Sequence, residues 1–183
     1  YFDVSPDVVT FKGGRLGIGT SEPRAVLDVR GDIHGGCPVY FQASLTTNFS
    51  AIPGGNLIIW DNLFEHKGGC YDTSTGLFTA PIDGLYQFGF QMRQRDSTYD
   101  RFWTYIEKNG SATSANGPGR VYGYALSGDV KYLSSTFILD LVVGDTIGVQ
   151  LHEPADSDSQ IASTYNGFYG YYIGNGTGAS ISY

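Results

Sequence analysis

The sequence predicts an all-β sandwich or jelly roll, and three observations support that class. Short apolar runs recur at regular spacing, and residues that favour tight turns separate them. The 183 residues include 26 glycines, 14 tyrosines and 11 phenylalanines but one methionine, which is typical of β-structure with many turns. No stretch shows the apolar period of a helix. The length suits one domain with a hydrophobic core and an appendage.

The central element is predicted at residues 77–92, as strand, turn and strand. Pro81 ends a short extended run, because proline cannot donate to a ladder. Asp83 and Gly84 form a strong turn pair, since glycine accepts a positive φ. The second strand carries aromatic side chains at alternate positions, which predicts a half-buried strand at the centre of the core. These side chains are Tyr86, Phe88 and Phe90.

Shorter apolar runs predict the other strands. In chain order they lie at 39–45, 57–60, 102–108, 121–126, 132–143, 146–151 and 165–173. The run at 57–60 is apolar throughout, as expected of a strand buried on both faces. Residues 64–72 are predicted as a loop that Tyr71 anchors. Asn109 and Gly110 predict a type I′ turn, followed by an exposed loop at 111–119.

The N-terminal part predicts a separate segment. Residues 1–10 suggest an entering strand or coil, and residues 14–33 a short strand, a glycine and proline corner, and a second short strand. Such a piece cannot bury its own apolar face, so it must contact another domain or copies of itself. Residues 34–38 have the composition of a linker. We therefore expect a segment at 1–36 and a main domain at 37–183, in a chain that is a fragment or a processed product because it begins at Tyr1.

Charge and motifs exclude several classes of function. The net charge is −7 and the lysines and arginines are scattered, which argues against nucleic-acid binding. The sequence contains no run of about 18 apolar residues, so we expect no segment embedded in a membrane. The sequence contains no nucleophile elbow, P-loop or dinucleotide motif, and its histidines lack metal-ligand spacing, so we expect no enzyme. A glycan-degrading enzyme is the weakest alternative. Cys37 and Cys70 could pair or could both be buried free thiols.

Two stretches resemble known families. Residues 14–33, GRLGIGTSEPRAVLDVRGDI, resemble the GIGT repeat of phage tail fibres and of some bacterial surface stalks. In those fibres three chains wrap into an intertwined β-prism. The alternative is an isolated hairpin.

The main domain resembles the globular head of the complement C1q family, which is close in fold to the tumour necrosis factor domains. The family signature falls on six positions with no gaps: Tyr71, Phe78, Gly84, Tyr86, Phe88 and Phe90. Trp60 and His66 depart from the upstream Phe and Asn or Asp. Residues 39–45, 137–145 and 163–168 resemble the family's opening strand, its L-x-L-x-x-GD hairpin and its closing strand. The resemblance covers 39–173 and implies a ten-stranded jelly roll that assembles as a homotrimer.

A threefold assembly also has a physical basis. Aromatic residues make up 15% of the chain, more than one small sandwich easily buries. We expect part of this aromatic surface to form the interface. The candidates lie in the closing strand: Tyr169, Tyr171 and Tyr172.

Ligand recognition is expected on loops at one end of the domain, at 93–101, 111–120 and 153–160. Residues there combine aromatic faces with planar donors, which suits sugars or protein surfaces. The candidates are Arg95, Tyr99, Arg101, Trp103 and Tyr122. The alternative is that the arginines are ordinary surface charges. Glu153, Asp156 and Asp158 are candidate Ca²⁺ ligands, since calcium takes several oxygen ligands; a solvated acidic loop is the alternative.

Together these features predict a trimeric fibre tip that attaches a virion or surface fibre to a host-cell glycan or protein. The expected location is the virion, or otherwise the extracellular space. Two alternatives share the fold: a secreted C1q-like recognition protein, and a structural cap that trimerises a fibre.

Overall fold

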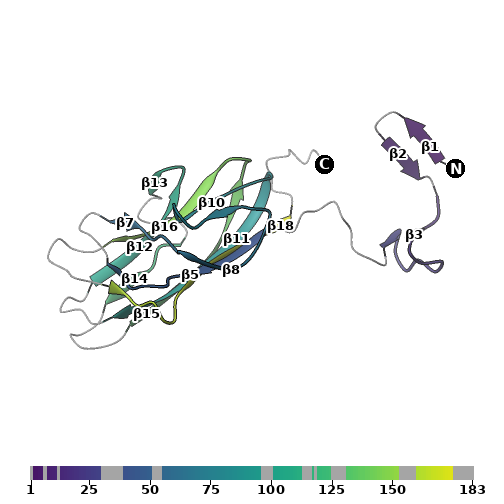
Figure 1. The fold of residues 1–183 in the computed structure, drawn as a ribbon. Coiled ribbons are helices and arrows are strands. Elements are labelled where there is room, and N and C mark those ends of the chain that lie inside the picture. Colours follow the sequence, from purple (N-terminus) through teal and green to yellow (C-terminus); the bar gives the residue numbers. More distant parts are fainter. Residues whose placement is uncertain are drawn as a thin grey trace. The chain divides into compact units, whose positions relative to one another are not determined.

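The computed structural model describes residues 2–5, 8–11, 13–29, 39–50, 55–95, 101–112, 117, 119–124, 131–152 and 160–174. Every regular element within these ranges is a strand, and none of them contains a helix that could cross a membrane. The chain divides into two compact units, Tyr1–Cys37 and Pro38–Tyr183, and Figure 1 shows the strands of both.

The first unit contains two pairs of short strands. β1 (Phe2–Ser5) pairs with β2 (Val8–Phe11) in antiparallel fashion. β3 (Leu16–Ile18) and β4 (Leu27–Val29) pair in parallel, with Leu16 opposite Leu27. The two strands predicted within 14–33 are therefore present, but they do not form a hairpin. Ile18, Val26 and Leu27 are more than half exposed, because two three-residue strands have no second layer to cover them.

The second unit consists of antiparallel strands in two sheets (Figure 1). Their bounds are β5 Tyr40–Ser44, β6 Phe49–Ser50, β7 Asn56–Leu57, β8 Asn62–Lys67, β9 Tyr71–Asp72, β10 Leu77–Thr79, β11 Gly84–Arg95, β12 Arg101–Lys108, β13 Ser111–Ala112, β14 Tyr122–Tyr124, β15 Lys131–Leu141, β16 Thr146–His152, β17 Gln160–Ile161 and β18 Gly167–Gly174. We call β8-β5-β18-β11-β15 with β17 and β6 the first sheet. The second sheet is β9-β10-β16-β12 with β13, β14 and β7.

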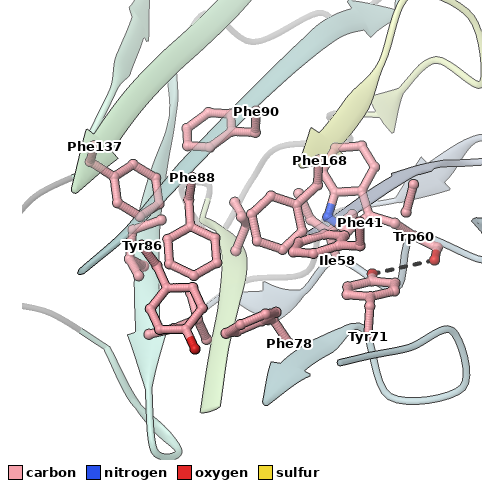
Figure 2. Packing of buried hydrophobic residues seen from close by; sticks show 14 of the residues in the cluster. Phe41, Ile58, Trp60, Tyr71, Phe78, Tyr86, Phe88, Phe90, Phe137 and Phe168 are labelled. Carbon is pink, nitrogen blue, oxygen red and sulfur yellow. Dashed lines mark hydrogen bonds between the residues drawn. The ribbon is translucent and has the colours of Figure 1, made fainter. Parts of the chain in front are cut away.

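An aromatic core fills the space between the sheets (Figure 2). Tyr86, Phe88 and Phe90 of β11 are all buried, as the alternation predicts. Phe78 reaches them from the second sheet, and its ring meets the Phe88 ring edge to face at 5.1 Å. Phe168 packs beside Phe88 from the neighbouring strand β18. Edge-to-face and offset contacts of this kind stabilise aromatic pairs by about 0.5–1.5 kcal/mol each beyond the area that they bury.

The two strands predicted within 77–92 are present, but the tight turn predicted to pair them is wrong. β10 pairs with β9 and β16, whereas β11 pairs with β15, β17 and β18, so the two strands belong to different sheets. The segment between them is a crossing rather than a tight hairpin turn. The Asp83 carboxylate fastens it by accepting a 2.7 Å hydrogen bond from the Val143 backbone N–H. Stretch 77–92 thus contributes to both layers of the core.

Two further predictions for 57–72 are corrected. Only Leu57 of the run 57–60 lies in a strand; Ile58 and Trp60 are fully buried, but Ile59 is 40% exposed. The chain leaves the sheet after Leu57 and directs alternate side chains into the core. Residues 64–72 contain β8 and β9 instead of a loop. Tyr71 does anchor this region, since its hydroxyl donates a 3.3 Å hydrogen bond to the Trp60 carbonyl (Figure 2).

The predicted turn at Asn109 and Gly110 is confirmed. Both residues have positive φ, 53° and 76°, which is the type I′ geometry. The turn joins β12 to β13, so Ser111 and Ala112 form a strand rather than the start of a loop. The Asn109 side chain also donates to Asp145 at 2.7 Å, and Lys108 forms a 2.8 Å ion pair with the same carboxylate. These contacts tie the turn to the β15–β16 connection.

Of the two cysteines, Cys70 is a buried free thiol. Burial raises its pKa to about 11, so the thiol stays protonated at neutral pH and is a poor nucleophile. Cys37 lies outside the described residues.

Candidate functional site

The structure brings together two of the five predicted ligand-binding residues. Trp103 of β12 lies directly opposite Tyr122 of β14. Arg101 begins β12 opposite Tyr124, but its side chain is outside the described part of the structure. Arg95 ends β11 in the first sheet, opposite Gln160, and its side chain is likewise undescribed. Tyr99 lies outside the described residues.

The period of β12 decides which side chains face outward. Thr104 and Ile106 are fully buried in the core, so the alternate residues Trp103, Tyr105 and Glu107 lie on the outer face of the second sheet. The buried Thr104 hydroxyl donates to the Gly119 carbonyl at 3.0 Å and accepts from the Val121 N–H at 3.1 Å. These bonds fix β14 against β12 and set the position of Tyr122.

Four aromatic side chains meet on this outer face, and we call them the aromatic row: Tyr122, Trp103, His152 and Tyr105. The Trp103 ring stacks against Tyr122 at 5.9 Å with a 10° interplanar angle, and against His152 at 6.1 Å and 21°. Tyr105 meets His152 edge to face at 4.6 Å. Three neighbouring strands, β14, β12 and β16, thus hold a continuous set of rings in contact.

Polar groups border the aromatic row. Gln150, opposite Tyr105, donates to the Glu107 carboxylate at 2.5 Å, and its carbonyl oxygen lies 3.0 Å from His152 Nε2. The Arg120 guanidinium lies over the Tyr105 ring, 5.0 Å from its centroid. A carboxylate, an amide and a guanidinium therefore stand beside the rings and offer both donors and acceptors.

The centre of the row is tightly held. A Cβ at Gly55 would lie 2.3 Å from the His152 ring, so the backbone there approaches the ring as only glycine allows. Burial lowers the pKa of His152, which keeps its imidazole neutral at pH 7. The Trp103 indole N–H is buried and has no hydrogen-bond partner among the described residues. The row combines rigid rings with neutral and charged polar groups at one end of the second sheet.

Sequence reasoning selected two of the four rings in the row and missed the other two and the polar groups beside them. Tyr105 could have been found, because it shares the alternation of Trp103. His152 could not, because it comes next to Trp103 only through the pairing of β12 with β16, two strands far apart in the sequence. Arg120 and Gln150 carried no signal of their own.

The predicted interface tyrosines divide between the two faces of β18. Tyr169 and Tyr171 face outward, whereas Tyr172 packs on the core, with its ring 5.3 Å from Tyr86. Tyr169 and Tyr171 line a shallow pocket of about 370 Å³ on the first sheet, together with Tyr40, Phe41, Gln42, Glu65 and Gly170.

The same outer face continues to β15. The β-ladder places Ile138, Gln87, Tyr171 and Tyr40 side by side across the sheet. Ile138 is 56% exposed at one end of this line and Tyr171 is 41% exposed near the other. The first sheet therefore carries apolar groups on its outer face as well as on its core face.

The predicted calcium ligands Glu153, Asp156 and Asp158 lie outside the described residues, and calcium binding there stays a prediction. Within the described ranges, no group of three or more His, Cys, Asp or Glu side chains could hold a metal ion.

Solved structures share this architecture. The globular domain of zebrafish complement 1qA superimposes with a TM-score of 0.58 at 15% identity, over 75% of this chain and 98% of that one. Murine APRIL at pH 5.0 gives 0.57 at 11% identity, over 74% and 99%, and Eiger TNF from S. frugiperda gives 0.51 at 12%, over 76% and 93%. The second unit is thus a jelly roll of the C1q and tumour necrosis factor class.

Sequence comparison narrows the class to a family. The C1q domain family matches residues 40–173, so the chain belongs to it. Complement C1q tumor necrosis factor-related protein 3 from Homo sapiens is 30% identical over 131 residues, which are 71% of this chain and 50% of the relative. Caprin-2 from Danio rerio is 29% identical over 136 residues, 73% and 14% of the two chains. The chain thus spans half the length of the human relative and 14% of the length of Caprin-2.

Family membership confirms the resemblance of the main domain. Domains of this class typically form homotrimers and act in recognition or signalling, and no enzyme family is indicated. The GIGT repeat of the first unit has no support in these comparisons.

Proposed function

We propose that this chain forms a homotrimeric extracellular recognition head at the tip of a virion or surface fibre, and that the aromatic row contacts a host-cell glycan or protein. The observation that carries this proposal is the row itself. Rigid rings with polar neighbours occupy the outer face of the second sheet, at the end where Trp103 and Tyr122 meet. Aromatic side chains held in place outside the core are typical of binding hot spots.

The outer face of the first sheet supports the trimer. A closed ring of three identical chains needs two different patches on each chain, which meet at every interface. One patch is β15 with the exposed Ile138, together with Val142 just after its end; the other is the pocket that Tyr169 and Tyr171 line. Covering both patches would remove exposed apolar groups from water, which stabilises the trimer by about 25 cal/mol per Å² of apolar surface buried. Tyr172 is left out of this interface because it packs on the core.

The first unit favours a head attached to a fibre over a head without a stalk. Its parallel strands β3 and β4 leave Ile18, Val26 and Leu27 exposed. Three copies side by side would cover these groups, as in an intertwined stalk. Its identity as a GIGT-type stalk, and the boundary between a segment at 1–36 and a head at 37–183, are part of this proposal.

Attachment of the purified chain to a panel of bacterial and animal cells tests the recognition function. We expect the native chain to attach to some cells, and Tyr122→Ala and Trp103→Ala to weaken attachment at least about ten-fold, as for hot-spot residues. Phe64→Ala is the matched control, since it removes an exposed ring on β8, away from the row. Attachment to none of the cells would refute the recognition function; equal attachment of the row variants would refute the row as its site.

Two alternatives share the trimer. A secreted C1q-like recognition protein agrees with the human relative, and attachment to animal cells alone would favour it. A structural cap agrees with the exposed strands of the first unit, which depend on other copies. If residues 1–37 lose their assembly when the second unit is deleted and the native chain attaches to no cell, the cap function holds.

A further inference from the structure

The two sheets differ in the apolar groups that they expose. Tyr132, Ile138, Tyr171 and Ile173 are exposed on β15 and β18 of the first sheet. Among the described side chains of β12, β14 and β16, Tyr122 is the large apolar group that is mainly exposed, at 53%. A protein partner covers about 800 Å² on each side, with an apolar centre. One exposed ring among polar groups instead suits a small ligand that has an apolar face and a polar rim.

We propose that the aromatic row binds a saccharide, with the apolar face of a hexopyranose ring stacked on Tyr122 and its hydroxyl groups bonded to the polar groups beside the row. This inference rests on the proposed recognition function and names the chemical class of its ligand. Axial C–H groups make one face of such a sugar apolar, while its hydroxyls keep the ring edge polar. An aromatic ring next to planar hydrogen-bonding groups matches both features.

The row holds Tyr122 ready for stacking. Trp103 backs its ring at 5.9 Å, nearly parallel, and His152 backs Trp103 in turn. His152 is held by the Gln150 amide and by the close approach of Gly55. A ring fixed in this way loses little side-chain entropy on binding, so more of the contact energy appears as affinity.

The polar groups favour an uncharged polyol over a phosphate or a basic peptide. Glu107 is negative and Arg120 positive, and both are joined to the row, through Gln150 and through the Tyr105 ring respectively. Their charges oppose each other, so neither an anionic nor a cationic ligand gains a net attraction. A carboxylate has up to four acceptor sites and a guanidinium five donors, which suits the hydroxyls of an oligosaccharide whose units extend along the row from Tyr122.

The test is an immobilised array of hexose-, N-acetylhexosamine- and sialic-acid-terminated oligosaccharides, probed with the full chain. We expect the native chain to bind at least one of them, and Tyr122→Ala to weaken that binding at least about ten-fold. Tyr122→Phe keeps the ring and should bind within about three-fold of the native chain. Phe64→Ala should bind as the native chain does. Every variant must keep the native particle size and melting temperature, since Tyr122 lies outside the core.

Tryptophan fluorescence gives a second readout. Trp60 is fully buried in the core and Trp103 lies in the row, so a bound sugar should shift the emission of the native chain and leave that of Trp103→Phe unchanged. Binding to no saccharide on the array, or equal binding by Tyr122→Ala, would overturn the inference.

Cells separate this inference from the proposed function. Periodate cleaves the vicinal diols of surface glycans, so treated cells should lose most of their attachment. If the chain attaches equally to treated and untreated cells, the saccharide inference fails while recognition stands. If it attaches to neither, the recognition function itself fails.

Discussion

At the scale of the residue, His152 shows how burial sets a charge. Its ring lies between Trp103 and Tyr105, and desolvation there lowers its pKa below the ordinary value of 6.5. The folded chain therefore takes up this proton at lower pH than the unfolded chain does. Acid should thus destabilise the fold around the row.

We expect the contribution of His152 to the free energy of unfolding to be complete above about pH 6.5 and to decrease as the pH is lowered through that value. In this range the unfolded chain binds less than one proton more than the folded chain. His152→Phe keeps a ring of similar shape and should remove this component. Denaturant unfolding at pH 5.5 and 7.5 measures it. The same difference between the two pH values in native and variant chains would contradict the assignment.

A second buried group, the Asp145 carboxylate, makes the stability depend on pH in a more acidic range. Burial alone would raise the pKa of Asp145, but hydrogen bonds from Asn109, Lys108 and the Val142 N–H outweigh it and hold that pKa below 3.8. This stability is present above about pH 4 and is lost as the pH falls below it. Asp145→Ala should cost about 1–3 kcal/mol at pH 7, because it removes the hydrogen bonds that a buried carboxylate accepts from Asn109, Lys108 and the Val142 N–H. Urea unfolding checks this value, and Glu22→Ala, at an exposed carboxylate of the first unit, should cost far less.

At the scale of the element, local patterns predicted strands better than their partners. The strands β11 and β15 and the turn at Asn109 depend on patterns among neighbouring residues, and all three are present in the structure. The sheet to which β10 belongs could not be predicted in this way, because a turn pair such as Asp83 and Gly84 fits a hairpin and a crossing between sheets equally well. Only the long-range pairing of β10 with β16 decides between them.

The candidate site follows the same division. Trp103 and Tyr122 could be selected by residue type, and the period of β12 adds Tyr105. His152 joins them through a register between β12 and β16, which depends on packing far along the chain. The arrangement at 57–60 also depends on packing, because an unbroken apolar run does not reveal that Ile59 turns outward while Ile58 and Trp60 turn inward.

At the scale of the whole molecule, the proposed trimer makes a direct prediction. Ile138→Asp places a carboxylate at the exposed edge of β15, where a single chain tolerates it but a dry interface does not. We expect light scattering to show particles of three chains for the native protein and single folded chains for the variant. Thr79→Asp, at an exposed residue of the second sheet, is the control and should stay trimeric. A native particle of one chain at low concentration would refute the trimer.

Calcium makes a separate prediction. If Glu153, Asp156 and Asp158 bind the ion, saturating calcium should raise the melting temperature, since a ligand at 100 times its Kd stabilises the native state by about 2.7 kcal/mol. Asp156→Asn combined with Asp158→Asn should remove the rise. An unchanged melting temperature with calcium and with chelator would eliminate the metal from this loop.

The position of β18 has a consequence for biosynthesis. β18, the last strand within the described ranges, lies between β5 and β11, with Phe168 opposite both Ala43 and Phe90. While the ribosome is still translating the stretch before Gly167, the middle of the first sheet is vacant and the aromatic rings of β5 and β11 have no neighbour between them. The first sheet cannot close until β18 has been synthesised, so we expect chaperones to engage the nascent chain before that point and stop codons placed upstream of β18 to yield insoluble product.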